Sequence, residues 1–430
     1  MMPQDSFGRF VGRMHRAGRL VVQPRMGVSD PAKMRRGLLA TRHANATTVG
    51  TITLDSYTRV ADNRAAVAAL QTGAPLNGYP IVAHDPRTTR AMLDGVRDPG
   101  VPVQVRHGSA VPQGIFAALV AAGLDASEGG PISYCLPYSR LPLRESMTNW
   151  ALCCELFARL RETGAEPHLE TFGGCMLGQL CPPSLLVAIS VLEGLFFRWF
   201  GLRSVSLSYA QQTNADQDAE AIAALRRLAA EFLCDVDWHV VIYAYMGVYP
   251  RTPKGASLLL EEAARLAVRN NAERLIVKTT AEAYRIPTFE ENVAALETAA
   301  AAAAECAGRP WAPPGDTGLY AEARTLIEAV LNLASRLDKS LICAFERGYL
   351  DVPYCLHPDN AGRARSYIDD EGRLRWSSVG ALPITAVAEC GPGNALSSSD
   401  LLAALSYVSR RCDAHAIERP SAPMIEQREQ

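Results

Sequence analysis

Three arginines stand near the ends of apolar segments of the chain. Arg25 lies in the stretch QPRMGV, Arg59 in LDSYTR and Arg106 in QVRHG. A guanidinium group is always charged and binds a carboxylate through two parallel hydrogen bonds. A single arginine of this kind is usually exposed or salt-bridged, but three that share one cavity repel one another unless an anion lies among them. The pattern therefore predicts a site for a small dicarboxylate.

A carboxylate and two tyrosines follow a later apolar segment. Glu128 lies in SEGG, and Tyr134 and Tyr138 lie in the ISYCLPY stretch just after it. Glu128 could simply neutralise the arginines, or it could receive the ammonium group of a substrate between hydrogen-bonding tyrosine walls. One carboxylate with three arginines suits an α-amino dicarboxylic acid.

Two further candidates are less specific. Lys278 and Glu282 are four residues apart, a spacing that on a helix gives an ion pair worth only about 0.2–0.5 kcal/mol. His107, next to Arg106 and a glycine, is the histidine most suited to a site, whereas His239 lies in an apolar strand and is more typical of a core. Because the eleven cysteines are scattered without a C-x-x-C pair, we predict reduced thiols in a cytoplasmic protein and no metal site.

Composition narrows the classes of function. The chain has 430 residues, of which 48% are hydrophobic and 20% charged, and its net charge of −2 argues against nucleic acid or an anionic membrane as partner. We interpret the basic N-terminal stretch as a solvated helical face. The longest apolar run, residues 185–202, is interrupted by Glu193 and Arg198, which predicts a buried helix and not a membrane span.

Apolar segments alternate with amphipathic stretches along most of the chain, which predicts βαβ units. Candidate strands are residues 20–23, 49–54, 80–83, 102–105, 123–127, 168–171, 204–208, 238–244 and 275–277. Polar residues follow nearly every strand, and only a closed barrel brings all those ends to one mouth, so we favour a (β/α)8 TIM barrel over an open doubly wound sheet. Nine candidates for eight strands mean that at least one is wrong.

The character of the sequence changes after the last candidate strand. Long Ala- and Leu-rich helices are expected at residues 290–307 and 319–337, followed by turn-rich segments and a polar tail from about residue 414. We predict a barrel over residues 1–290 that holds the cavity, and a C-terminal helical and irregular extension over residues 291–430 that braces it.

At these same positions the chain resembles the large (epsilon, or E) subunit of glutamate mutase, also called methylaspartate mutase. The resemblance covers the chain from about residue 19 to residue 383 and rests on a set of short motifs in the same order. They are QPRMGV (23–28), LDSYTR (54–59), LNGYP (76–80), QVRHG (104–108), SEGG (127–130), ISYCLPY (132–138), CPPS (181–184), IVKT (276–279), IPT (286–288), AFERG (344–348) and NAG (360–362).

The resemblance implies roles for individual residues. Arg25, Arg59 and Arg106 match the arginines around the substrate carboxylates, and Glu128 matches the carboxylate near the substrate amino group. The remaining matches are Tyr134 and Tyr138 at the substrate, Lys278 and Glu282 beside the adenosyl group, and Asn77, Pro137 and Phe172 facing the corrin.

The reaction implied is the interconversion of L-glutamate and (2S,3S)-3-methylaspartate by a radical rearrangement that depends on adenosylcobalamin. Because this chain has no D-x-H-x-x-G motif, the axial ligand of cobalt is expected from a separate small cobalamin-binding subunit. We expect a homodimer of this chain within a heterotetramer. Tyr243 stands where the family has an active-site histidine, so two alternatives stay open: a related mutase acting on another amino acid, and a non-catalytic paralogue that binds dicarboxylates.

Overall fold

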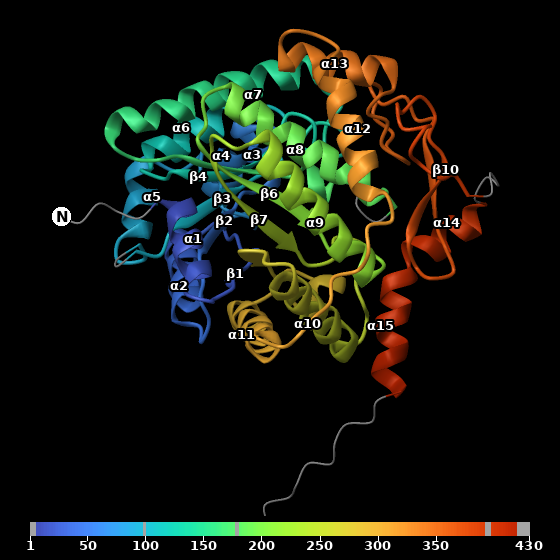
Figure 1. Cartoon of the computed structure of the whole chain (residues 1–430). Coiled ribbons are helices and arrows are strands. Elements are labelled where there is room, and N and C mark those ends of the chain that lie inside the picture. Colours follow the sequence, from blue (N-terminus) through green and yellow to red (C-terminus); the bar gives the residue numbers. More distant parts are fainter. Residues whose placement is uncertain (1–5, 98–99, 177–179, 392–396, 419–430) are drawn as a thin grey trace, which may run out of the picture.

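Eight parallel strands form a barrel surrounded by helices in the computed structural model (Figure 1). The structure describes residues 6–97, 100–176, 180–391 and 397–418. The strands run in the order β1-β8-β7-β6-β5-β4-β3-β2. A backbone hydrogen bond from Val22 to Thr47 brings β1 beside the residues that precede β2 and closes the barrel. The strands are β1 (Val21–Gln23), β2 (Gly50–Thr53), β3 (Val103–Arg106), β4 (Ala126–Gly129), β5 (His168–Thr171), β6 (Ser204–Ala210), β7 (Asp237–Tyr243) and β8 (Arg274–Ile276).

Helices follow the strands and begin at capping side chains. Asp30, Asn214, Thr252 and Thr288 each accept a hydrogen bond from the first turn of the helix that follows, which satisfies one of its free N–H groups. The helices of the barrel are α1 (Phe7–Arg16), α2 (Pro31–His43), α3 (Ser56–Arg59), α4 (Asn63–Thr72), α5 (Pro86–Leu93), α6 (Gln113–Ala121), α7 (Leu143–Ala158), α8 (Pro183–Trp199), α9 (Ala215–Phe232), α10 (Pro253–Arg269) and α11 (Phe289–Cys306).

The interior of the barrel holds a fully buried ion pair, Arg274 of β8 with Glu170 of β5. Side chains from other strands complete its hydrogen bonds: Gln104 of β3 donates to Glu170 at 3.1 Å, and Arg274 donates to Ser206 of β6 at 3.1 Å and to Gln23 of β1. A buried charge is tolerated only when it is paired and hydrogen-bonded. These contacts form only if the five strands that carry the residues, β1, β3, β5, β6 and β8, have the correct register.

Helix α1 covers the end of the barrel where the strands begin. Phe7 stacks on His168 with 5.0 Å between ring centres. A Cβ at Gly8 would lie 2.4 Å from Ser204 Oγ, so only glycine allows this close approach. The basic residues Arg9 and Arg16 are exposed, which agrees with a solvated helical face.

The predicted fold class is confirmed, but two predicted elements are wrong. Residues 80–83 form a turn in which the N–H groups of Ala83 and His84 both bond to Pro80 O; proline lacks the N–H that a central strand needs. Glu128 therefore lies on the fourth strand and not after the fifth. The helix expected at 319–337 is two helices, α12 (Leu319–Leu331) and α13 (Leu337–Arg347), because Ser340 Oγ bonds to the backbone of Ala334 between them.

The C-terminal part lies along one side of the barrel (Figure 1). After α13 it contains the hairpin β9 (Arg365–Ile368) and β10 (Leu374–Ser378), then α14 (Ser398–Leu405) and α15 (Tyr407–Glu418). α15 continues past residue 414, where a polar tail was expected, and residues 419–430 lie outside the described part. α11 packs against α10, α2 and β1, while the division of the chain at residue 290 stays a prediction.

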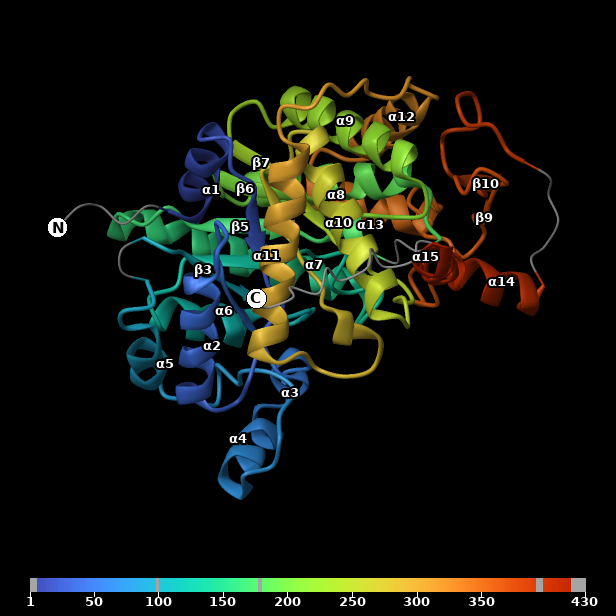
Figure 2. The same ribbon diagram turned by 90° about the horizontal axis from the view of Figure 1, so that it is seen from below.

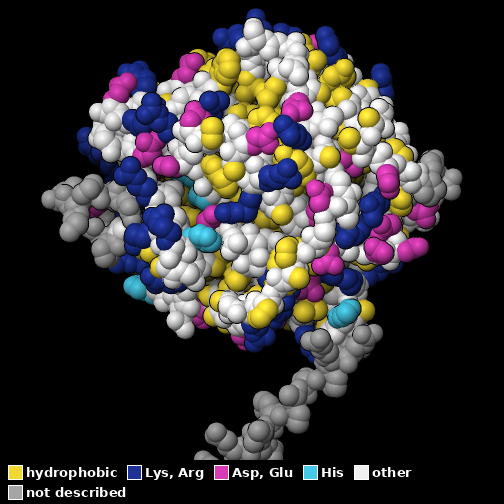
Figure 3. All heavy atoms as spheres, in the orientation of Figure 1, with side chains coloured by type: hydrophobic (Ala, Val, Ile, Leu, Met, Phe, Trp, Pro, Cys, Tyr) yellow, Lys and Arg dark blue, Asp and Glu magenta, His cyan; other side chains and the backbone are white. Residues whose placement is uncertain are grey.

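The surface and the long helices agree with the composition. Basic and acidic side chains are interspersed over the face drawn in Figure 3. Residues 185–199 of the apolar run lie in α8 (Pro183–Trp199), and their side chains are almost all buried. None of the helices that the structure describes is long and apolar enough to cross a membrane.

Candidate functional site

A cavity of about 290 Å³ lies at the carboxyl ends of the strands. It brings together eight of the eleven residues predicted for the site: Arg25, Arg59, Asn77, Arg106, Glu128, Tyr134, Tyr138 and Phe172. Thr53, Leu54, Ser56, His107, Gly108 and Met246 complete the lining. These residues come from the ends of six different strands, which is the position of the active site in barrels of this fold.

Arg106 and Glu128 form the innermost charged pair of the cavity. Arg106 Nε donates to Glu128 Oε2 at 2.7 Å, and both residues are almost completely buried. Tyr134 donates to the other oxygen of Glu128. Burial disfavours the charged guanidinium, but Glu128, Tyr243 and Tyr134 outweigh it and raise the pKa of Arg106 well above its usual value. The pair thus presents a fixed positive and a fixed negative charge side by side.

Arg25, Glu282 and Lys278 form a second charged group at the edge of the cavity. Glu282 lies 3.6 Å from Arg25 Nη1 and 4.0 Å from Lys278 Nζ. Burial and the charge of Arg25 lower the pKa of Lys278 to about 8, against the opposite effect of Glu282. Lys278 and Glu282 do not line the cavity themselves, and they connect to it through Arg25.

Arg59 lies at the end of the short helix α3 and makes no ion pair with any residue that the structure describes. Asp55 holds the start of α3 by accepting from the N–H groups of Tyr57 and Thr58, and Asn77 Oδ1 accepts from Ser56 N at 2.9 Å. Gly108 has φ +80°, and a Cβ there would lie 3.1 Å from Arg59 Cδ. The glycine after Arg106 thus makes room for the side chain of Arg59.

Three aromatic rings form one wall. The ring of Tyr134 lies 5.9 Å from that of Tyr138 and 5.1 Å from that of Phe172. Glu193 of α8 holds the two loops that carry these rings, because it accepts hydrogen bonds from the backbone of Ser133 at 2.9 Å and of Phe172 at 3.2 Å. The sequence showed Glu193 only as a charge inside an apolar helix, and that anomaly was the available signal of its role.

Two residues of the cavity lining each carry a buried polar atom without a partner in the part of the chain that the structure describes. Thr53 Oγ1 and His107 Nε2 make no hydrogen bond within the described residues. His107 Nδ1 accepts from Ser109 N at 3.0 Å, which places the ring proton on Nε2. Burial and Arg106 lower the pKa of His107 to about 3, so its imidazole is neutral.

Tyr243 of β7 lies beneath this cavity and connects it to the polar layer of the barrel. Its hydroxyl lies 2.7 Å from Glu128 Oε2 and also contacts Glu170. The guanidinium of Arg106 is 5.0 Å from the centre of the Tyr243 ring. The Tyr243 hydroxyl contacts both carboxylates, so a shift of Glu128 would disturb the contact with Glu170 as well. Glu170 was missed in the sequence, where a lone acid inside a strand gives no sign of its partner.

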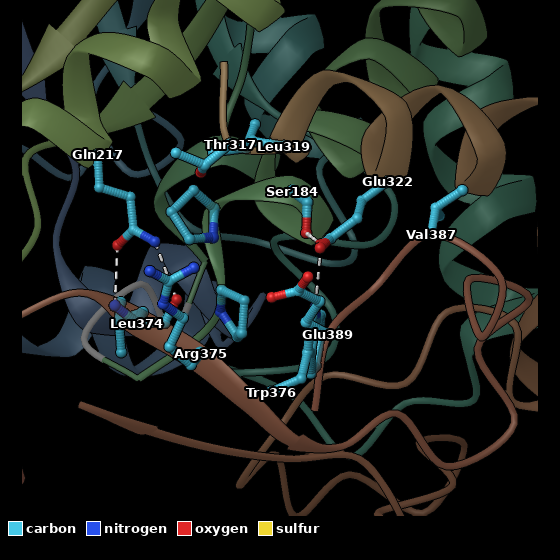
Figure 4. A pocket seen from close by; sticks show the side chains of 12 residues that line it. Ser184, Gln217, Thr317, Leu319, Glu322, Leu374, Arg375, Trp376, Val387 and Glu389 are labelled. Atoms are coloured by element: carbon cyan, nitrogen blue, oxygen red, sulfur yellow. Dashed lines mark hydrogen bonds between the residues drawn. The ribbon is translucent and has the colours of Figure 1, made fainter. Parts of the chain in front are cut away.

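A third predicted residue, besides Lys278 and Glu282, lies outside the cavity lining. Pro137 lines a neighbouring surface groove that shares Tyr138 with it. A separate small hollow lies between α8, α9, α12 and β10 (Figure 4). Its polar groups bond to one another: Gln217 pairs with both backbone groups of Leu374, and Glu322 accepts from Ser184 and Trp376. This hollow joins the C-terminal part to the barrel.

Comparison with known proteins identifies the family of the chain. The model of the methylaspartate mutase E chain family matches residues 2–391. The chain belongs to this family. It is 31% identical over 388 residues to the glutamate mutase epsilon subunit of Halobacterium salinarum, with 87% of this chain and 81% of that protein covered. The epsilon subunits of Desulfitobacterium hafniense and Escherichia coli O157:H7 are 32% and 30% identical, each over 77% of this chain and 72% of the relative.

Membership of the methylaspartate mutase E chain family agrees with the resemblance on which the site was predicted. The matched region includes all eight strands and every residue of the cavity. The family name supports a role as a mutase subunit, and "epsilon subunit" in the names of the relatives indicates that those proteins work with another chain.

Proposed function

We propose that this chain is the catalytic barrel subunit of an adenosylcobalamin-dependent glutamate mutase, an isomerase that interconverts L-glutamate and (2S,3S)-3-methylaspartate by a radical rearrangement. The observation that carries the proposal is the meeting of Arg25, Arg59 and Arg106 with Glu128 in one cavity. Three guanidinium groups and one carboxylate complement two carboxylates and one ammonium group. Membership of the mutase family supports the same assignment.

The charges of the cavity match those of an amino acid. The Arg106–Glu128 pair offers a cation and an anion side by side, as a zwitterion requires. Arg59, which forms no ion pair within the described residues, and Arg25, whose Nη1 lies 3.6 Å from Glu282, would bind the second carboxylate. Several directional contacts hold a molecule that comes apart and rejoins, because fragments kept in place react as if at very high concentration.

The mouth of the barrel fits a flat, partly apolar cofactor. Large apolar side chains after the strands are exposed around it: Tyr57, Val60, Val111, Tyr138, Val248, Tyr284 and Ile286. We infer that Asn77, Pro137 and Phe172 contact the corrin ring and that Lys278 and Glu282 contact the adenosyl group. When bound, adenosylcobalamin supplies the radical that starts the rearrangement. The residues of this chain orient the substrate and exclude water.

The same rim suits a protein partner. Exposed apolar patches mark interaction surfaces, and helix α4 stands out from the barrel next to it (Figure 2). We propose that a small cobalamin-binding subunit of the D-x-H-x-x-G type docks there and supplies the axial ligand of cobalt, and that two copies of this chain form a homodimer within a heterotetramer.

Reconstitution tests the proposal. The chain is mixed with a small cobalamin-binding subunit, adenosylcobalamin and L-glutamate, and NMR is used to look for 3-methylaspartate. Product formation that is lost in Arg59→Ala supports the assignment. An assembled holoenzyme that gives neither product nor a radical signal with glutamate refutes it.

A second candidate follows from Tyr243, because its hydroxyl bonds to the carboxylate expected to hold the substrate ammonium. It is a related mutase that acts on another amino acid. Testing further α-amino acids in the same assay, with glutamate as the reference, separates the two candidates by which one turns over.

A further inference from the structure

Helix α15 packs on the loop that joins β7 to α10 at the mouth of the barrel. Val408 and Cys412 of α15 are buried in one cluster with Tyr245 and Tyr249 of this loop. α15 also packs against α10. The helix follows residue 391, where the family match ends.

Asp413 of α15 holds the end of the loop where α10 begins. Its carboxylate accepts hydrogen bonds from the backbone of Arg251 and Thr252, each at 3.0 Å, and from the hydroxyl of Thr252 at 2.6 Å. A Cβ at Gly255 would lie 2.6 Å from Asp413 Oδ1 and 3.2 Å from the carbonyl carbon of Cys412. A glycine at this position of α10 therefore permits the close approach of α15.

Tyr249 of the same loop contacts the charged group at the edge of the cavity. Lys278 Nζ lies 5.1 Å from the centre of the Tyr249 ring, a cation–π arrangement. Glu282 lies 4.0 Å from the same ammonium and 3.6 Å from Arg25 of the cavity lining. Tyr249, Glu282 and Arg25 are thus the groups that set the surroundings of Lys278.

We propose that α15 is a positioning element of the candidate site, which holds Tyr249 against Lys278 through the contacts of Asp413 with the start of α10. Release of α15 exposes the ring cluster, lets Tyr249 move away and admits water to the ammonium. The consequence for turnover rests on the proposed function, whereas the effect on Lys278 does not.

Two variants release α15 by independent means. Asp413→Ala removes the acceptor, and Gly255→Ala places a methyl group where Asp413 stands. Acetic anhydride labelling of Lys278 is followed against pH by mass spectrometry in the full chain, with the exposed Lys33 and Lys339 as internal references. We expect a midpoint of about 8 in the unaltered protein and a higher one in both variants, since hydration favours the charged form.

Asp400→Ala is the matched control, because Asp400 lies in the first turn of α14 and its side chain accepts hydrogen bonds from no described residue but Ser397. This variant should leave the midpoint at about 8. Hydrogen exchange over residues 407–416 reports whether α15 is released. An unchanged Lys278 midpoint after release overturns the proposal, and so does retention of α15 in both variants. Absence of glutamate turnover in the unaltered holoenzyme would count against the proposed function alone.

Discussion

Replacement of Glu193 by alanine should lower the free energy of unfolding by about 3 kcal/mol. The side chain accepts from three backbone N–H groups, those of Ile132 at 3.2 Å, Ser133 at 2.9 Å and Phe172 at 3.2 Å. A buried donor without an acceptor costs about 1–3 kcal/mol. We take the lower end for each of the three, about 1 kcal/mol, because water can enter the space left by the side chain.

Glu193→Gln should cost less, about 1 kcal/mol, because only one backbone donor loses its acceptor. The amide oxygen can accept from Ile132 and Ser133, and the amide nitrogen can donate to the hydroxyl of Ser133. The amide nitrogen then faces the N–H of Phe172, which is left unsatisfied. The difference in free energy of unfolding between the two variants therefore measures the contribution of the oxygen that accepts from Ile132 and Ser133.

This cost should also depend on pH. Burial raises the pKa of Glu193 from its usual 4.5 to about 7, against the hydrogen bonds from Ser133, Phe172 and Ile132. The unfolded chain therefore releases this proton at lower pH than the folded protein. The protonated side chain therefore contributes stability that is fully present below pH 4.5 and is lost as the pH rises through 7. Glutamine does not titrate, so the destabilisation caused by Glu193→Gln should shrink between pH 5 and pH 8.

Urea unfolding followed by circular dichroism, at pH 5 and at pH 8, measures both effects. Glu155→Gln, an exposed position on the neighbouring helix α7, is the matched control and should change the free energy of unfolding by less than about 0.5 kcal/mol at either pH. The reasoning is refuted if Glu193→Ala costs less than about 1 kcal/mol or if the cost of Glu193→Gln grows with pH.

Three further substitutions test the charged interior. Arg106→Lys keeps the charge but loses the directed Nε contact with Glu128 at 2.7 Å; a hydrogen bond to a charged group is worth about 1.5–3 kcal/mol, so kcat/KM of the holoenzyme should fall roughly 10- to 150-fold, and unchanged kinetics would remove Arg106 from the site. Arg274→Met leaves Glu170 buried without its counter-charge and should lower the free energy of unfolding in urea by about 3–5 kcal/mol; a loss under about 1 kcal/mol would contradict this. Tyr243→Phe keeps the ring but removes the hydroxyl shared by the two carboxylates, and should lower the free energy of unfolding by about 1–3 kcal/mol.

Much of the fold could be predicted because periodicity and capping are local properties of the sequence. Eight of the nine predicted strands exist, and the start of α9 is marked by the capping residue Asn214, after which an amphipathic pattern follows. The turn at residues 80–83 was mistaken for a strand because Ile81 and Val82 favour strands locally. Its hydrogen bonds to Pro80 O depend on a backbone path that composition does not reveal.

The sequence by itself determined which residues meet at the mouth. Parallel strands all end on the same side of a barrel, so polar residues at the strand ends gather near one mouth. Arg25, Arg59, Arg106 and Glu128 could therefore be grouped without coordinates, and the structure places all four around one cavity.

Only the tertiary structure decided which charges are paired and which are left for a ligand. Arg106 is held by Glu128 and Arg25 lies near Glu282, while Arg59 has no described ion-pair partner. Glu193 and Asp413 act through contacts with segments at least twenty residues away along the chain. Such pairings depend on the relative positions of strands and helices in space, which no local spacing of residue types encodes.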